Sequence, residues 1–132
     1  MKFLSDAFYM IKHSLLNLGS DLMTDTAVDS GDWTHTGRTV NAPGTASGSD
    51  TVVFTLSEPT KAGRDYLVEI PNDVPAVSFY VDLVGSDQVG GLSSSDTEVL
   101  LTNVSAKPTL RIGRWGGAPA GNIGPITIRE QV

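Results

Sequence analysis

The chain has 132 residues, enough for one domain with a hydrophobic core, and its nine basic and 15 acidic side chains give a net charge of −6. Contact with a phosphate backbone or an anionic bilayer needs clustered Lys and Arg, and here the basic residues are scattered. We therefore expect no nucleic-acid partner. No apolar run approaches the roughly 20 residues of a membrane span, so no insertion into a membrane is expected either. The absence of cysteine excludes disulfides, thiolate metal sites and a cysteine nucleophile.

Residues 1–22 carry the only helical periodicity. Apolar residues recur there at alternating spacings of four and three, as in a coiled coil: Leu4, Phe8, Ile11, Leu15, Leu18 and Leu22. Gly19 and Ser20 weaken the far end, so we expect the helix to stop near Leu18. Asp6, Lys12 and His13 interrupt the segment, so it is not expected to be a signal peptide.

A helix of this length is marginal alone in water, so its apolar stripe must be covered. It can fold back onto its own domain, or it can pack against copies of itself or dock into a larger assembly. We favour the second arrangement, because the remainder of the chain predicts a self-sufficient domain. Residues 1–22 are thus expected to form an oligomerisation or docking helix through Leu4, Phe8, Ile11, Leu15 and Leu18, with a homotrimer as the favoured state.

From Ala27 onward the apolar pattern alternates, which is the period of a half-buried strand. The clearest segments are 51–56, 66–70, 77–83, 98–101, 110–115 and 126–129. The side chains expected to point inward are Val52, Phe54 and Leu56, then Tyr66, Val68 and Ile70, then Val77, Phe79, Val81 and Leu83. Those expected to point outward from the third segment are Ser78, Tyr80 and Asp82.

Turn signals separate these segments, and charged residues make up only 18% of the sequence, below the roughly 25% typical of globular proteins. The turn signals are Pro43-Gly44, Ala62-Gly63, Pro71-Asn-Asp73, Gly90-Gly91, Gly116-Gly117 and Gly124-Pro125. Six to eight short strands at this spacing predict a mainly β protein, an antiparallel β-sandwich or jelly roll over residues 23–132, preceded by the short N-terminal α-helix.

Several short motifs of the predicted sandwich resemble a known family. They are Ser30-Gly-Asp-Trp33, the hairpin Lys61-Ala-Gly-Arg-Asp-Tyr-Leu-Val68, the strand Leu110-Arg-Ile112 and the closing Gly124-Pro-Ile-Thr-Ile-Arg129. In this order they resemble the galactose-binding-like jelly roll of carbohydrate-binding modules, which also occurs in tailed-phage tail and head-appendage proteins. The resemblance covers residues 28–132 and implies a jelly-roll fold.

The resemblance, joined to a short helical stalk, implies a structural or adhesive component of a tailed-phage virion, such as a head decoration, head fibre, collar or tail appendage. That location is an extracellular particle, with other virion proteins as partners and self-association through the N-terminal helix. The alternative is a carbohydrate-binding module that recognises host-surface glycans through an exposed aromatic and arginine patch. The two interpretations are compatible.

Catalytic and metal motifs are not recognisable. His13 and His35 lie outside any metal-ligand spacing; a solvated or packing role is expected for His13, and a surface position on a strand for His35. The acidic residues Asp50, Asp73 and Asp87 lie in turns, where carboxylates accept hydrogen bonds from backbone amides. We expect no enzymatic activity, no metal site and no cofactor.

A ligand-binding face is the more plausible kind of site. Sugar recognition combines an aromatic platform with planar polar groups, and the residues that would supply them are Tyr80, Arg111, Arg114, Trp115 and Asn122. Arg111 and Trp115 share an outward parity on one strand, and Tyr80 faces outward on its own. The alternative is that Trp115 covers the sandwich edge or is buried at a subunit contact. Trp33 is expected in the core.

Overall fold

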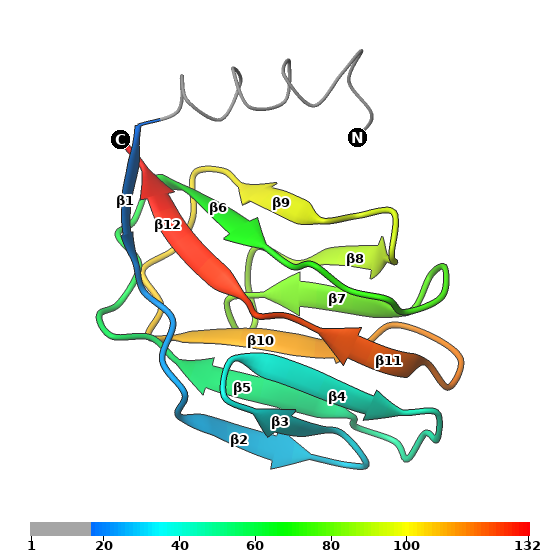
Figure 1. The fold of residues 1–132 in the computed structure, drawn as a ribbon. Helices are drawn as coiled ribbons and strands as arrows, with labels where there is room; N and C mark the ends of the chain where they lie inside the picture. Colours follow the sequence, from blue (N-terminus) through cyan, green and yellow to red (C-terminus); the bar gives the residue numbers. More distant parts are fainter. Residues whose placement is uncertain (1–16) are drawn as a thin grey trace.

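The computed structural model describes residues 17–132, in which the regular elements are twelve short strands (Figure 1). They are β1 (Leu18–Asp21), β2 (Ala27–Ser30), β3 (Thr34–Thr36), β4 (Thr39–Pro43), β5 (Thr51–Thr55), β6 (Asp65–Glu69), β7 (Phe79–Asp82), β8 (Val89–Leu92), β9 (Glu98–Leu101), β10 (Thr109–Arg114), β11 (Ala120–Ile123) and β12 (Thr127–Gln131). This part of the chain contains no helix of the length and apolarity that crossing a membrane requires.

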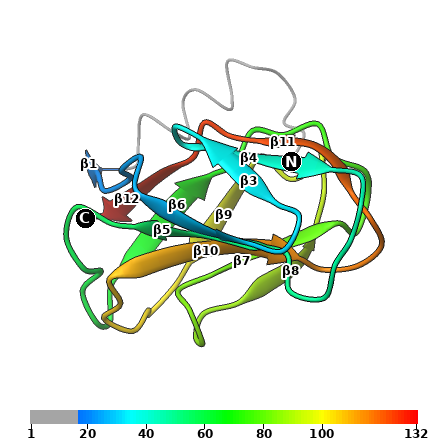
Figure 2. The same ribbon diagram turned by 90° about the horizontal axis from the view of Figure 1, so that it is seen from below.

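The strands form three antiparallel sheets. The first has the order β1-β12-β6-β9, the second β2-β5-β10-β7-β8, and the third β11-β4-β3. In Figures 1 and 2 the five-stranded sheet lies on one side of the molecule, and the four- and three-stranded sheets lie across from it. The predicted antiparallel, mainly β fold is confirmed, and the sheets are arranged in a β-sandwich-like manner.

One hydrophobic core lies between the sheets, and it receives side chains from all three. The inward sets predicted for the segments 51–56 and 66–70 are confirmed: Val52, Phe54 and Leu56 on and after β5, and Tyr66, Val68 and Ile70 on and after β6 are all buried. Trp33 is fully buried, as expected. Alternation places these residues together because successive side chains of a strand point to opposite faces.

The N-terminal helix does not extend to Leu18 and Leu22. Leu18 begins β1, which pairs with β12, and Leu22 is a buried member of the core. The Leu22 amide donates to the Ile128 carbonyl, and Oδ1 of Asp21 accepts from the Ile128 amide at 3.0 Å. An edge strand with a free row of hydrogen-bonding groups therefore outweighs the heptad spacing here. The other predicted contact residues, Leu4, Phe8, Ile11 and Leu15, lie outside the described residues.

The predicted orientation of Val77 and Ser78 is wrong. β7 begins only at Phe79, and the chain turns at Val77, whose φ is 57° and whose side chain is 59% exposed. Ser78 is buried, and its hydroxyl donates to the carbonyl of Pro75. The inward and outward alternation therefore begins at Phe79, and the two residues before it belong to the turn.

Two further predictions need correction. Gly90 and Gly91 do not form a turn between strands, because both lie in β8, which pairs with β7. The strands also number twelve rather than six to eight. The additional ones, such as β3 (Thr34–Thr36) and β11 (Ala120–Ile123), are short and contain few apolar residues, so a hydrophobic pattern does not reveal them.

Candidate functional site: the outer face of the five-stranded sheet

Strand β10 divides its side chains between the core and the outer surface of the sheet. Leu110 and Ile112 are fully buried, whereas Arg111 and Gly113 alternate with them and face outward. Cross-strand pairing places Arg111 opposite Asp82 and Gly113 opposite Tyr80 on β7. The outward parity expected for Tyr80 and Arg111 is thus observed, and Asp82, although outward, is buried. We call Tyr80, Asp82, Arg111 and Trp115 the aromatic face.

Two glycines let the aromatic rings lie against the sheet. A Cβ atom on Gly113 would stand 2.3–2.4 Å from three atoms of the Tyr80 phenol, and one on Gly90 would stand 2.2–2.5 Å from three atoms of the Trp115 indole. No side chain tolerates such contacts, and neither glycine has a positive φ. These glycines are therefore present for the close approach of the rings, a known use of glycine in strands.

Trp115 follows directly after β10 and is 48% exposed. Since part of its indole is seated on Gly90, the exposed part is the side turned away from the sheet. The Tyr80 and Trp115 ring centroids are 6.3 Å apart with an interplanar angle of 65°, which is the preferred edge-to-face arrangement. The two rings brace one another and present a fixed apolar platform to solvent.

Arg111 and Asp82 form a bidentate ion pair beside the platform. Nε of Arg111 donates to Oδ1 of Asp82 at 2.9 Å, and Nη2 donates to Oδ2 at 2.6 Å. The guanidinium carbon lies 5.5 Å from the centre of the Tyr80 ring, within the range of a cation–π contact. The hydrogen bond with Asp82 outweighs desolvation and raises the pKa of Arg111. Arg111 is thus held as a fixed, planar donor group with its charge compensated.

Tyr80 keeps its phenol neutral over the ordinary pH range. Burial raises its pKa above the ordinary 10.0, the positive charge of Arg111 opposes this rise, and the negative charge of Asp82 adds to it. A neutral phenol can both donate and accept a hydrogen bond. The aromatic face therefore combines two rings, one hydroxyl and one paired guanidinium.

Arg114 supports neighbouring loops rather than the platform. Its Nε donates to Oδ2 of the fully buried Asp50 at 2.8 Å, and its two terminal nitrogens donate to the carbonyls of Gly48 and Gly117. It therefore ties the segment after β10 to the loop between β4 and β5. Of the five predicted ligand residues, Arg114 is close to the platform in sequence but has its hydrogen-bonding groups turned toward the protein.

Asp50 is the central hydrogen-bond acceptor in this connection between the two segments. It accepts hydrogen bonds from the Asp32 amide at 2.7 Å and from the Ser47 amide at 2.9 Å, in addition to Arg114. Burial raises the pKa of Asp50, but the hydrogen bonds from Asp32, Ser47 and Arg114 outweigh burial and hold that pKa below the ordinary 3.8. The expectation that turn carboxylates accept from backbone amides is confirmed here. Asp73 and Asp87 behave in the same way toward the amides of Asn122 and Ser105.

Asn122 belongs to another part of the surface. It lies on β11 in the three-stranded sheet, opposite Asn41, and is exposed. Within residues 17–132 it forms no hydrogen bond with Tyr80, Arg111 or Trp115, and its amide donates to Asp73 instead. The structure therefore brings three of the five predicted residues together and leaves Asn122 aside.

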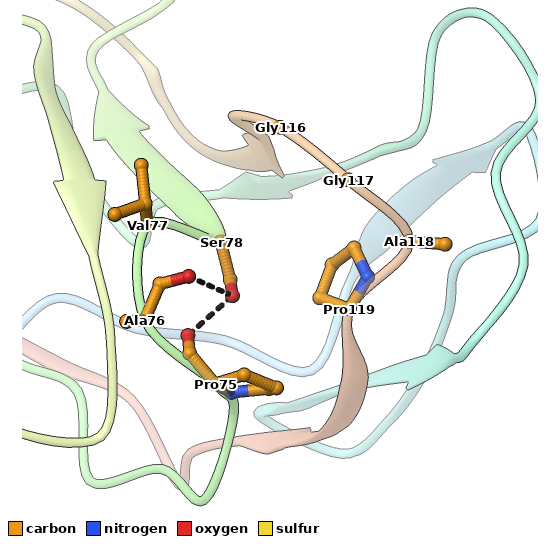
Figure 3. Close-up of a pocket in the computed structure, with 8 residues that line it drawn as sticks. All are labelled: Pro75, Ala76, Val77, Ser78, Gly116, Gly117, Ala118 and Pro119. Carbon is orange, nitrogen blue, oxygen red and sulfur yellow. Dashed lines mark hydrogen bonds between the residues drawn. The ribbon is translucent and has the colours of Figure 1, made fainter.

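An open groove of about 420 Å³ lies between two segments that flank the five-stranded sheet (Figure 3). Its two walls are the segments before β7 and after β10: Pro75, Ala76, Val77 and Ser78 on one side, Gly116, Gly117, Ala118 and Pro119 on the other. In Figure 3 Pro75, Ser78 and Pro119 turn toward the space between the segments, whereas Ala118 points away from it. This groove was not predicted from the sequence.

His35 has a packing role. Its Nδ1 lies 2.6 Å from Oδ1 of Asp29, and its ring packs edge-on against Phe54 at 5.8 Å. The side chain is 21% exposed, so His35 lies at the surface of β3 with its ring partly covered. His13 lies outside the described residues. Residues 17–132 hold no group of three or more metal-binding side chains.

Sequence reasoning missed Asp82, Gly90 and Gly113 as parts of the site. A glycine inside an alternating segment, as at Gly113, signals a close approach of some other group, and this signal was available. Comparisons of the chain with protein-family models, with characterised proteins and with solved structures find no match.

Proposed function

We propose that this chain is a non-enzymatic adhesion module of the jelly-roll type, which binds glycans through the aromatic face. The observation that carries the proposal is the seating of Trp115 on Gly90 and of Tyr80 on Gly113, which leaves a half-exposed indole in a fixed orientation. A ring held in this way costs little conformational entropy when a ligand binds to it.

Glycans suit this surface better than other ligands do. The C–H faces of a pyranose stack on an aromatic ring, and its hydroxyls need planar donors and acceptors near the ring edge. Tyr80 supplies a hydroxyl, and Arg111 supplies a guanidinium whose Nη1 has no partner among the described residues. Because Asp82 already balances the charge of Arg111, the site offers hydrogen bonds without demanding an anionic ligand.

The decisive experiment is a glycan array with the full-length chain and two variants. Trp115→Ala should weaken binding at least about tenfold, because the stacking surface is lost. The free energy of unfolding should change by less than about 1 kcal/mol, because the ring is half exposed. Trp115→Phe keeps a smaller ring on Gly90 and should retain part of the affinity. A chain that binds nothing across a broad array, or a Trp115→Ala variant that binds as well as the parent, would contradict the proposal.

The wider setting we propose is a tailed-phage virion, in which the module is displayed by self-association through its N-terminal segment. A truncation that tests this role must leave β1 intact, because β1 begins at Leu18 and pairs with β12. Deletion of residues 1–16 keeps all twelve strands and should convert an oligomer into a monomer in light scattering. If the truncated chain keeps the oligomeric state of the full-length protein, the predicted role of Leu4, Phe8, Ile11 and Leu15 is wrong.

A further inference from the structure

We infer that the ligand is a neutral glycan chain of several sugar units, which stacks one unit on Trp115 and continues into the groove between residues 75–78 and 116–119. The inference rests on the proposed function and specifies it further, because a platform alone would bind a single terminal sugar equally well.

The first observation is continuity between the platform and the groove. The Trp115 amide donates to the Ser78 carbonyl at 2.9 Å, and both Ser78 and the next residue, Gly116, line the groove. The groove therefore starts at the backbone of the residue that carries the platform. Its volume of about 420 Å³ falls within the range of roughly 300–1,000 Å³ found for small-molecule sites.

The second observation is strain at the rim of the groove. Val77 has a φ of 57°, a left-handed conformation that is a true outlier for a β-branched residue, and its side chain is 59% exposed. Strained backbone of this kind is concentrated at binding sites, where the surroundings hold it in place. Among the described residues, the only exposed large hydrophobic side chains besides Val77 and Trp115 are Val28, Leu100 and Val132.

The third observation is the absence of net charge. All eight residues that line the groove are uncharged, and the guanidinium of Arg111 is paired with Asp82. The chain as a whole carries a net charge of −6. An anionic polysaccharide would meet no free cation at the groove and would be repelled at longer range. A neutral chain, whose hydroxyls can bond to backbone groups along the two loops, fits these conditions.

The inference is tested by titration calorimetry of the full-length protein with sugars of increasing length. The probes are glucose, cellobiose and cellohexaose, then the mannose and maltose series of the same lengths, and hexagalacturonate as the anionic comparison. For the series that binds, we expect the hexasaccharide to bind at least about tenfold more tightly than the monosaccharide, because more apolar surface is covered. Hexagalacturonate should bind more weakly than the neutral hexasaccharide.

A variant that fills the groove then distinguishes binding on Trp115 from binding in the groove. A Cβ atom on Gly116 would point toward the Val77 carbonyl at 3.7 Å, an ordinary contact, and Gly116 does not have a positive φ. Gly116→Leu should therefore fill the groove, remove the gain of the hexasaccharide and leave monosaccharide binding within about twofold. Ala106→Leu introduces the same leucine side chain at an exposed site in the loop that precedes β10, and it should change neither the hexasaccharide gain nor monosaccharide binding. Pro75→Ala shortens one wall of the groove and should remove part of the affinity gain of the hexasaccharide. This variant replaces Gly116→Leu in the test if Gly116→Leu does not fold.

The outcomes separate the two ideas. If monosaccharide and hexasaccharide bind equally and Trp115→Ala abolishes both, the platform binds glycans but the groove inference is wrong. If the hexasaccharide gain survives both Gly116→Leu and Pro75→Ala, or if hexagalacturonate binds best, the inference is likewise wrong. If no probe binds, or if Trp115→Ala has no effect, the proposed function itself fails.

Discussion

The chain contains two arginine–aspartate pairs on β10 that look alike in isolation and differ in their surroundings. In both, the carboxylate is buried and the guanidinium is partly exposed, with contacts of 2.8 Å for Arg114–Asp50 and 2.6 Å for Arg111–Asp82. Asp50 also accepts from two backbone amides, and Arg114 donates to two carbonyls. Among the described residues, Asp82 accepts only from Arg111.

The difference indicates separate roles. The Arg114–Asp50 pair satisfies backbone groups of three segments, so its loss would leave several polar groups without partners. The Arg111–Asp82 pair satisfies only itself and lies on the outer side of the sheet beside Tyr80, where Asp82 is buried and Arg111 is partly exposed. A group that keeps an unused donor and costs the fold little is suited to a ligand. The first pair holds the loops that flank the platform, and the second belongs to the platform.

The largest expected effect is that of Asp50→Ala. The variant would leave two backbone amides and a guanidinium without their acceptor, and removal of one partner from a buried pair costs about 3–5 kcal/mol. Asp82→Ala should cost less, about 1–3 kcal/mol, because only the partly exposed Arg111 guanidinium loses its acceptor and no backbone amide does. Urea denaturation of both variants measures the two free energies of unfolding. Equal losses would show that the two pairs do not differ as described.

Acid should reveal the contribution of Asp50 to the stability of the fold. The pKa of Asp50 is depressed in the folded state, so its ionised form stabilises the fold above the ordinary 3.8. That contribution is lost as the pH falls through the lower, folded-state pKa, since the carboxylate must then take up a proton that it binds more readily when unfolded. Asp50→Asn should therefore flatten the pH dependence of the urea midpoint below about pH 4. An unchanged slope would indicate that other carboxylates dominate acid unfolding.

The seating of the rings predicts an effect of intermediate size. Gly113→Ala would push the Tyr80 ring off the sheet and should destabilise the fold by about 1–2 kcal/mol, the usual cost of overpacking. Gly90→Ala should act in the same way on Trp115 and increase the quenching of its fluorescence by acrylamide, while Trp33 stays protected in the core. Gly37→Ala is the control, because a Cβ atom there meets nothing within 4 Å. Its φ of 60° adds a local backbone cost, so ring displacement is judged by quenching, which Gly37→Ala should not alter.

A smaller effect of opposite sign is expected at Val77. Val77→Asn should stabilise the fold by about 1 kcal/mol, because Asn tolerates a φ of 57° far better than a β-branched residue does. The same variant should weaken binding of the hexasaccharide, since it replaces an apolar side chain at the rim of the groove. The measurement is a urea midpoint alongside a calorimetric titration. A destabilised variant would mean that contacts of the Val77 side chain outweigh the relief of strain.

Alternation predicted the strands that are half buried and apolar on one face. β5, β6 and β10 were found because Val52, Phe54, Tyr66, Val68, Leu110 and Ile112 repeat with a period of two. The same rule placed Tyr80 and Arg111 on the outer surface. Elements such as β3 and β8 were not predicted, because Thr-His-Thr and Val-Gly-Gly-Leu have no apolar alternation. Pairing with the neighbouring strands holds both elements in place.

Cross-strand proximity was beyond the reach of pattern reasoning. Neither the pairing of Arg111 with Asp82 nor the position of Gly90 beneath Trp115 follows from spacing, since each depends on which strands are adjacent and in what register. The helix prediction for Leu18 and Leu22 is wrong for a related reason. Their heptad spacing is real, but the open edge of β12 and the core beneath it stabilise an extended conformation for this stretch.

The smallest expected effect concerns the ionisation of Tyr80. Burial and the negative charge of Asp82 raise its pKa, and Arg111 opposes them. Asp82→Asn removes one raising influence and leaves Arg111 without its counter-charge, so the pKa of Tyr80 should fall toward the ordinary 10.0. An ultraviolet pH titration of the parent and the variant follows the change, with Tyr80→Phe identifying which tyrosine titrates. If the pKa of Tyr80 does not move, burial alone sets it and the ion pair has no electrostatic influence on the phenol. Arg111 would then not act together with Tyr80 in binding a ligand.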